Sequence, residues 1–231
     1  MNLIVGGGKY GSEAVEYLLK HSKPFIVVDE NEECFAVKNF ELASINKVDE
    51  VDLSSSKNYF LKGGMKEALE IIEKLKPEYV FTTAPIHVAA ALVKEKYSLK
   101  EWNEGINCIL VGIPFKVVIS VGKGSVVVSY NRDKACKPKC EAPDVCPITK
   151  IKKPCPMYEL LRFASPTGII LQSHQLKPGL GALKGKEVLE MLEGCHGKDK
   201  IVIGTACRCH GVVTALKAKP RSGNESEHTK N

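Results

Sequence analysis

Four cysteines stand close together between residues 136 and 156, in a stretch that also holds five prolines. The stretch has neither a helical nor an alternating apolar period, so it cannot hold its shape by burying one face. Thiolates can fix such a loop by closing on a metal ion or an iron–sulfur cluster, and the prolines stiffen the chain between ligands. We therefore predict a metal site with these ligands: Cys136, Cys140, Cys146 and Cys155.

The spacing of these cysteines, C-x3-C-x5-C-x8-C, matches neither the C-x2-C pairs of structural zinc nor the ferredoxin run C-x2-C-x2-C-x3-C-P. Cys146 and Cys155 are each followed directly by proline, as is the last cysteine of the ferredoxin run. This feature favours a [4Fe–4S] cluster as the cofactor. Zinc is the first alternative, and disulfides or free thiols are the second.

A second group of reactive side chains is formed by Cys207, Cys209 and His210, which follow a predicted strand over residues 200–204. A predicted helix over residues 212–217 comes directly afterwards. A helix N-terminus lowers the pKa of a nearby thiol through its exposed amides and its dipole. The three side chains are therefore candidate catalytic residues, acting as metal ligands, electron or proton carriers, or a dithiol. The alternative is that one cysteine is only buried as a small apolar residue.

The chain opens with an apolar strand over residues 2–5, then Gly6, Gly8 and Gly11, then an amphipathic segment over residues 12–20. In this G-x-G-x-x-G spacing the first glycine allows a tight turn and the second lets a pyrophosphate approach the backbone. The third lets helix and strand pack closely, and the helix N-terminus favours phosphate. The alternative is a turn whose glycines serve packing alone.

A second buried strand over residues 24–29 ends in Asp29, eighteen residues after Gly11. An acid at this strand end accepts hydrogen bonds from ribose hydroxyls and repels a 2′-phosphate, so NAD is favoured over NADP as the cofactor. His87 follows another predicted strand, over residues 78–83, and is expected at the same edge of the sheet. We predict that it contacts the cofactor or substrate; an exposed or helix-capping histidine is the alternative.

The run Leu-Ile-Val-Gly-Gly-Gly-Lys-Tyr-Gly-Ser-Glu-Ala and the later Phe-Ile-Val-Val-Asp-Glu-Asn resemble the nucleotide-binding domain of the potassium-conductance regulators, the RCK or TrkA-N family. The resemblance covers residues 2–35. It implies a Rossmann fold that binds NAD(H) or another adenine nucleotide, and nucleotide binding is the only function carried over. The binding residues that it implies are Gly6, Gly8, Gly11 and Asp29.

The predicted elements make an α/β protein, with an N-terminal Rossmann-like parallel sheet followed by a smaller, cysteine-rich α/β domain. Strands and helices alternate up to a fifth predicted strand over residues 106–111, and a predicted β-hairpin over residues 116–130 then ends the alternation. We therefore expect a nucleotide-binding domain over residues 1–114 and a domain with the metal or iron–sulfur site over residues 115–217.

Within the second domain, a glycine-rich turn over residues 177–185 is predicted to open a helix over residues 186–193. A strand, a glycine loop and a helix in this order form either an anion-binding site or an ordinary tight turn. Residues 218–231 are polar, lack an apolar period and are predicted to be a disordered tail.

The composition indicates a globular protein: 231 residues, of which 44% are hydrophobic. Seven of the nine cysteines lie after residue 135, which in a reducing compartment favours metal or redox chemistry over structural disulfides. The other two, Cys34 and Cys108, are expected to pack in the interior. The chain starts in an apolar strand without a signal-peptide pattern, and no apolar run reaches membrane-spanning length. We therefore expect a cytoplasmic protein without a membrane partner.

The net charge of +6 lies mainly in residues 134–153 and the tail, without interleaved aromatics, so nucleic acid is not the expected partner. Lysines near a thiolate site would offset the negative charge of a cluster. The expected partners are an adenine nucleotide and a small-molecule substrate or redox partner, with a homo-oligomer left open. Two functions remain: an NAD-dependent oxidoreductase with an iron–sulfur cluster, and a nucleotide-sensing regulatory protein with a structural zinc or iron–sulfur site.

Overall fold

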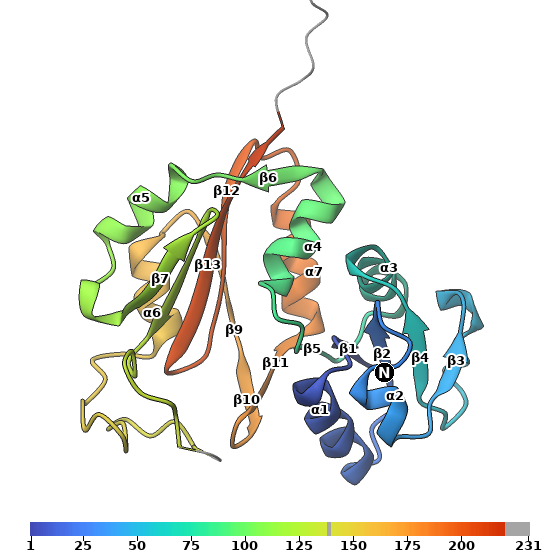
Figure 1. Cartoon of the computed structure of the whole chain (residues 1–231). Coiled ribbons are helices and arrows are strands. Elements are labelled where there is room, and N and C mark those ends of the chain that lie inside the picture. Colours follow the sequence, from blue (N-terminus) through green and yellow to red (C-terminus); the bar gives the residue numbers. More distant parts are fainter. Residues whose placement is uncertain (138–139, 220–231) are drawn as a thin grey trace, which may run out of the picture.

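A computed structural model describes residues 1–137 and 140–219 of the chain. Within them, the strands form two sheets with helices between them and on their outer faces (Figure 1). The prediction of an α/β protein, with a Rossmann-like sheet followed by a cysteine-rich α/β part, is confirmed. Ala218 ends the last strand, and the rest of the predicted tail, from residue 220, lies outside the described residues.

The first sheet has the strand order of half a Rossmann fold at its centre, β4-β2-β1-β5, with all four strands parallel. The central strand β1 is buried at every residue, as expected of a parallel strand covered on both faces. Two strands from the C-terminal half extend this sheet, because β11 pairs antiparallel with β5. In spatial order the strands are β10 (His174–Lys177), β11 (Leu180–Lys184), β5 (Tyr79–Thr82), β1 (Asn2–Val5), β2 (Phe25–Asp29), β4 (Tyr59–Lys62) and β3 (Ala43–Ile45).

The second sheet is mostly antiparallel, and only β9 and β12 pair in parallel. Its long strand β13 also pairs with the short strand β6 from the middle of the chain. In spatial order the strands are β7 (Val118–Gly122), β8 (Ser125–Ser129), β13 (His210–Ala218), β12 (Lys200–Ala206) and β9 (Ile169–Gln172), with β6 (Leu99–Glu101) beside β13. The sheets exchange strands, since β6 precedes residue 114 and β10 and β11 follow it.

Each helix buries an apolar face; helix α3 (Met65–Leu75), for example, buries Ala68, Ile71 and Ile72. Its C-cap residue Lys76 has a positive φ of 46°, and Pro77 follows and cannot continue the helix. The helices are α1 (Lys9–Lys20), α2 (Phe35–Asn39), α3 (Met65–Leu75), α4 (Val88–Tyr97), α5 (Gly105–Val111), α6 (Met157–Ala164) and α7 (Gly185–Gly194), with single 3-10 turns at Val48–Glu50 and Phe115–Val117.

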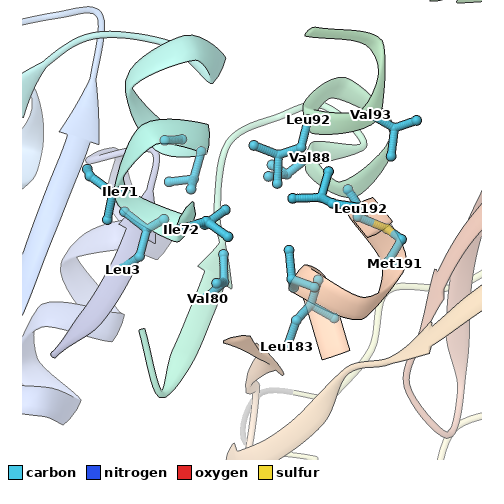
Figure 2. Packing of buried hydrophobic residues seen from close by; sticks show 14 of the residues in the cluster. Leu3, Ile71, Ile72, Val80, Val88, Leu92, Val93, Leu183, Met191 and Leu192 are labelled. Carbon is cyan, nitrogen blue, oxygen red and sulfur yellow. The ribbon is translucent and has the colours of Figure 1, made fainter. Parts of the chain in front are cut away.

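The helices α4 and α7 lie in the layer between the two sheets, where they share one apolar core (Figures 1 and 2). In this core Val80 and Leu183 of the first sheet meet Leu92 of α4 and Leu192 of α7. Strands β9, β12 and β13 contribute to the same core from the other side, through Leu171, Ile201, Ile203 and Leu216. Helices α1 and α2 cover the outer face of the first sheet, and α5 and α6 cover that of the second. The two sheets are therefore joined by buried apolar surface as well as by the chain.

Three predicted elements were wrong. The segment over residues 106–111 is the helix α5 and not a strand, since Ile106 and Ile109 are three residues apart and bury one helical face. The segment over residues 212–217 belongs to strand β13 and not to a helix. Val213 and Leu216 are both buried, but against opposite faces of the sheet, so the sequence shows no alternation.

The glycine-rich segment over residues 177–185 does not run from a strand into a helix. It contains the turn of the β10–β11 hairpin, with Gly179 at φ = +85°, followed by strand β11 itself. Helix α7 begins only after that strand, at Gly185. The predicted turn from a strand directly into a helix is therefore wrong.

Candidate functional site

The turn between β1 and α1 has the close backbone packing of a dinucleotide-binding turn. Gly6 has φ = +101°, and a Cβ at this position would lie 2.6 Å from the backbone nitrogen of Ala84, just after β5. A Cβ at Gly11 would lie 2.1 Å from the Gly6 carbonyl oxygen, so α1 packs directly on the turn. A Cβ at Gly8, in contrast, would meet no atom within 4 Å. The outer side of Gly8 is thus the open side of the turn.

Asp29 ends β2 and lies beside this turn. Its Oδ2 accepts the N–H of Gly7 at 2.6 Å, and its Oδ1 accepts the N–H of Asn31 at 2.8 Å. Because each carboxylate oxygen has two lone pairs, each retains one acceptor position. The structure therefore places the predicted cofactor residues other than His87 at one end of the first sheet: Gly6, Gly8, Gly11 and Asp29.

His87 is the N-cap residue of α4, and its ring contacts the second sheet. Its Nδ1 lies 2.7 Å from Thr214 Oγ1 on β13, which lies 2.7 Å from Ser125 Oγ on β8. Its Nε2 is buried and has no hydrogen-bond partner among the described residues. Burial lowers the pKa of His87 to about 4, because the charged ring would lose its hydration. The sequence pointed to a cofactor contact for His87 and gave no sign of this contact with Thr214.

A cavity of about 330 Å³ collects most of the cysteines of the C-terminal half. It lies between the loop from β8 to α6, the tip of the β12–β13 hairpin and the β10–β11 hairpin, all at the lower end of the molecule in Figure 1. We call it the thiol cavity; the thiols and the imidazole that line it belong to Cys136, Cys140, Cys146, Cys207, Cys209 and His210. The predicted metal loop and the predicted catalytic group are therefore parts of one site.

Strand register brings these two groups together. On the β13–β8 ladder His210 is paired with Ser129, and the Tyr130 N–H donates to the Cys209 carbonyl at 3.0 Å. The loop that leaves β8 therefore starts beside the hairpin tip. Two further contacts hold the loop over the cavity. Arg208 forms an ion pair with Asp144, and Gln175 Nε2 donates a 3.0 Å hydrogen bond to the Cys140 carbonyl.

The hairpin tip surrounds the Cys207 sulfur with donors. The Cys207 N–H donates to the His210 carbonyl at 2.9 Å, and the resulting tight turn directs the N–H groups of Cys209 and His210 to Cys207 Sγ, each at 3.4 Å. Burial would raise the pKa of the Cys207 thiol, but these donors and the His210 ring lower it below its ordinary value. The prediction that a helix N-terminus activates this thiol was wrong, since β13 follows; the amides of a β-turn take that role.

The loop presents Cys146 in a similar tight turn. The Lys150 N–H donates to the Cys146 carbonyl at 2.8 Å, and the Thr149 N–H points to Cys146 Sγ at 3.5 Å. Burial opposes the effect, but the donors from Thr149 and the nearby charge of Lys153 lower the pKa of the Cys146 thiol. Amide donors thus stabilise a thiolate on the loop as well as on the hairpin.

Lys153 is a buried cation that the sequence did not single out. Its Nζ donates to the Ala142 carbonyl at 3.1 Å and to Cys209 Sγ at 3.2 Å. No carboxylate lies within ion-pair distance of it among the described residues. Burial raises the pKa of the Cys209 thiol, and the nearby Cys207 and Cys140 raise it further. The Lys153 ammonium acts in the opposite direction and lowers it. In the sequence Lys153 is one of many lysines, and only its burial in the structure distinguishes it as a candidate functional residue.

The remaining two loop cysteines have different surroundings. Cys136 is exposed, and its Sγ lies 3.2 Å from His210 Nε2 and 3.4 Å from Asn131 Nδ2. Cys155 does not line the thiol cavity. Tyr130 lines the cavity, and its hydroxyl donates to the Cys155 carbonyl at 2.9 Å and lies 3.9 Å from Cys155 Sγ.

The cysteines outside the cavity are of two kinds. Cys34 is buried against Gly7 of the glycine turn, and Cys195 is buried in the helical layer, where burial raises its pKa to about 11. Cys108 is exposed on α5, so its expected packing role was wrong.

The fold and the site define an α/β protein that combines a Rossmann-like glycine turn with a thiol-lined cavity. The chain belongs to the AF_1314 family: its N-terminal domain model matches residues 1–88 and its C-terminal domain model residues 88–219, both described as domains of an "uncharacterized protein". A relative from Archaeoglobus fulgidus, also named "uncharacterized protein", is 52% identical over 217 residues, which are 94% of this chain and 99% of that protein.

The resemblance to the potassium-conductance regulators is therefore corrected, because both family models that match the chain are of the AF_1314 family. Among solved structures, a UDP-glucose 4-epimerase from Thermotoga maritima, crystallised with UDP-glucose, is similar with 27% identity and a TM-score of 0.24. The similarity covers 41% of this chain and 28% of the epimerase chain. A TM-score this low does not define a shared fold.

The two family models divide the chain at residue 88, while the boundary near residue 114 stays a prediction. Among the helices of the described residues, none has the length and apolarity needed to cross a bilayer.

Proposed function

We propose that this protein is a cytoplasmic oxidoreductase that binds NAD at the glycine turn of β1 and α1 and holds an iron–sulfur cluster in the thiol cavity. The observation that carries the proposal is the convergence of five thiols, from two segments distant in the sequence, on one cavity, with amide donors directed at two of the sulfurs, those of Cys146 and Cys207. Hydrogen bonds to thiolate ligands are a general feature of cysteine-ligated metal centres and tune their potentials.

The geometry of the thiols favours a cluster over a single ion. A zinc site needs all its ligands about 2.0–2.3 Å from one point. Among the described residues, no three histidine, cysteine, aspartate or glutamate side chains converge in this way. The iron atoms of a cluster are spread over a larger body, so its thiolates stand around a volume instead of a point. A cavity of about 330 Å³ lined by thiols suits that arrangement.

The charge of the lining supports an anionic occupant. Lys137 and Lys153 line the cavity, and no aspartate or glutamate is among its described lining residues. A cluster held by four thiolates carries net negative charge, and a buried lysine is stabilised by an anion beside it.

Support for the dinucleotide comes from the first sheet. Its central strand order places the Gly6 turn at the crevice between β1 and β5, where ligands of open α/β sheets bind. Gly8 faces open space, and Asp29 retains acceptor positions for ribose hydroxyls. NADH supplies two electrons as hydride and a cluster passes single electrons, so the two groups together would serve a redox reaction with an unnamed substrate.

One observation favours a second candidate, a nucleotide sensor. The β10–β11 hairpin contacts both helix α1 and the thiol cavity: Lys177 Nζ donates to the Glu13 carbonyl of α1 at 3.3 Å, while Leu180 lines the thiol cavity and also belongs to the core beneath α1. Nucleotide binding in such a protein would change the second half without turnover.

The test is anaerobic purification of the full chain, followed by iron, sulfide and zinc analysis and an absorption spectrum before and after NADH. A brown protein with broad absorbance near about 400 nm that bleaches with NADH supports the oxidoreductase. A protein that contains the cluster and binds NADH, but whose cluster NADH does not reduce, supports the sensor. A colourless protein with stoichiometric zinc overturns the oxidoreductase.

A further inference from the structure

The sequence and the structure suggest different ligands for the metal centre. In the sequence the four loop cysteines form a closed group, which ends at Cys155. In the structure Cys155 does not line the thiol cavity but lines a separate surface depression together with Asp144 and Arg208.

Two thiols from outside the loop occupy the cavity instead. Cys207 and Cys209 are separated by one residue on the hairpin tip and both line the cavity. The strand ladder fixes the tip, since the Cys207 N–H, the Tyr130 N–H and the Met157 N–H all bond to carbonyls of residues 208–210. The two sulfurs therefore stand on a hydrogen-bonded hairpin tip, which suits metal ligands.

Lys153 connects the loop to the tip. Its Nζ lies 3.2 Å from Cys209 Sγ on the tip and donates to the Ala142 carbonyl on the loop at 3.1 Å. No carboxylate in the described part of the chain lies within ion-pair distance of Lys153, so an anionic cluster beside it would balance its charge. Cys136, in contrast, is exposed, and its sulfur is already in contact with His210 Nε2 at 3.2 Å.

Resting on the proposed cluster, we propose that its ligands are two thiolates of the loop and two of the hairpin tip: Cys140, Cys146, Cys207 and Cys209. Cys136 lies at the rim of the site and Cys155 outside it. The centre then links the loop after β8 to the β12–β13 hairpin, and its metal stabilises the contact between them.

Serine variants at two positions separate the two ligand sets. Under the proposal Cys155→Ser keeps the wild-type iron content and spectrum, and Cys209→Ser loses most of its iron. The opposite pattern, with iron lost from Cys155→Ser and kept in Cys209→Ser, would overturn the proposal and assign the ligands to the four loop cysteines. Cys136→Ser is the matched control on the loop. Loss of iron from this variant would show that Cys136 is a ligand and would overturn its exclusion from the ligand set.

Alkylation of the wild-type protein avoids the question of whether a variant folds. Iodoacetamide is added to the native metal-loaded protein and to the same protein after chelation, and modified cysteines are identified by mass spectrometry. The four proposed ligands should be protected only in the loaded protein. Cys108 is exposed and should react in both samples, and Cys195 is buried and should react in neither. Protection of Cys155 in place of Cys209 contradicts the proposal.

The wild-type metal content tells the two proposals apart. Iron in the wild type with the wrong protection pattern overturns the ligand set and leaves the oxidoreductase standing. Zinc with the right pattern overturns the oxidoreductase and leaves the ligand set standing. A wild-type protein without metal overturns both.

Discussion

At the scale of single residues, the glycine turn offers a matched pair of substitutions. A Cβ at Gly8 would meet no atom within 4 Å, whereas a Cβ at Gly11 would lie 2.1 Å from the Gly6 carbonyl oxygen. An alanine at Gly8 therefore changes only the space available to a ligand, and an alanine at Gly11 changes the fold as well. This difference separates a binding role from a packing role.

We expect Gly8→Ala to weaken NADH binding at least about tenfold with an unchanged unfolding midpoint, since the added methyl group occupies the space where a pyrophosphate approaches the backbone. We expect Gly11→Ala to weaken binding and to lower the free energy of unfolding by about 1–3 kcal/mol. Fluorescence titration with NADH and thermal unfolding of both variants check this. Wild-type NADH affinity in Gly8→Ala would contradict the dinucleotide site.

His87 gives a prediction for pH dependence. Its pKa is about 4 in the folded protein against an ordinary value of 6.5, so the unfolded chain binds the proton more tightly. The neutral ring stabilises the fold fully above pH 6.5, and this contribution is lost as the pH falls from 6.5 to about 4. The pKa difference corresponds to about 3 kcal/mol.

We therefore expect the wild-type free energy of unfolding to fall by about 3 kcal/mol more than that of His87→Gln between pH 7.5 and pH 4. Glutamine keeps a polar group near Thr214 Oγ1 but does not titrate, so it is the control for all other groups. Urea unfolding at several pH values measures both proteins. Parallel pH profiles of the two proteins would show that His87 is not buried in solution.

At the scale of the elements, the start of α7 is the most tightly packed joint between the two halves of the sequence. Gly185 donates its N–H to the Glu78 carbonyl at 2.9 Å, and a Cβ there would lie 1.7 Å from the Pro77 carbonyl oxygen. This contact lies directly after β11, which pairs with β5 and belongs to the hairpin that contacts α1 and lines the thiol cavity.

We expect Gly185→Ala to lower the free energy of unfolding by at least about 2 kcal/mol, because a backbone carbonyl has to move to admit the methyl group. Gly122→Ala is the matched control, since a Cβ there meets no atom within 4 Å. Chemical unfolding of both variants measures the difference. Equal stability of the two would mean that α7 shifts freely against β5.

At the scale of the whole molecule, one helical layer and one hairpin join the two sites. Helices α4 and α7 pack against both sheets, and the β10–β11 hairpin contacts α1 on one side and lines the thiol cavity on the other. A ligand that orders the hairpin at one site therefore reduces the cost of ordering it at the other, and this coupling is reciprocal.

We expect the metal-loaded protein to bind NADH about fivefold more tightly than the protein stripped of metal. Calorimetric titration of the two forms gives the ratio, and hydrogen exchange should show slower exchange of residues 174–184 when NADH is added. Equal affinities together with unchanged exchange in the hairpin would show that the two sites are independent.

Local sequence was enough to predict the glycine turn and its place in the fold. Gly6, Gly8 and Gly11 lie within one strand-turn-helix unit, and Asp29 ends the next strand, so their spacing along the chain already sets their positions in space. The cysteine loop was also recognisable, because four thiols crowded among prolines in a stretch without an apolar period indicate a shared ligand. The sequence alone therefore located both groups of candidate residues.

Tertiary structure decided which thiols meet. Cys209 reaches the loop because β13 pairs with β8 in the register that sets His210 opposite Ser129, and no local pattern encodes that register. The same strand was mistaken for a helix because both its faces are buried, Val213 on one side and Leu216 on the other. Lys153 and Tyr130 acquire their roles only through burial and neighbours, which depend on contacts between residues far apart in the chain.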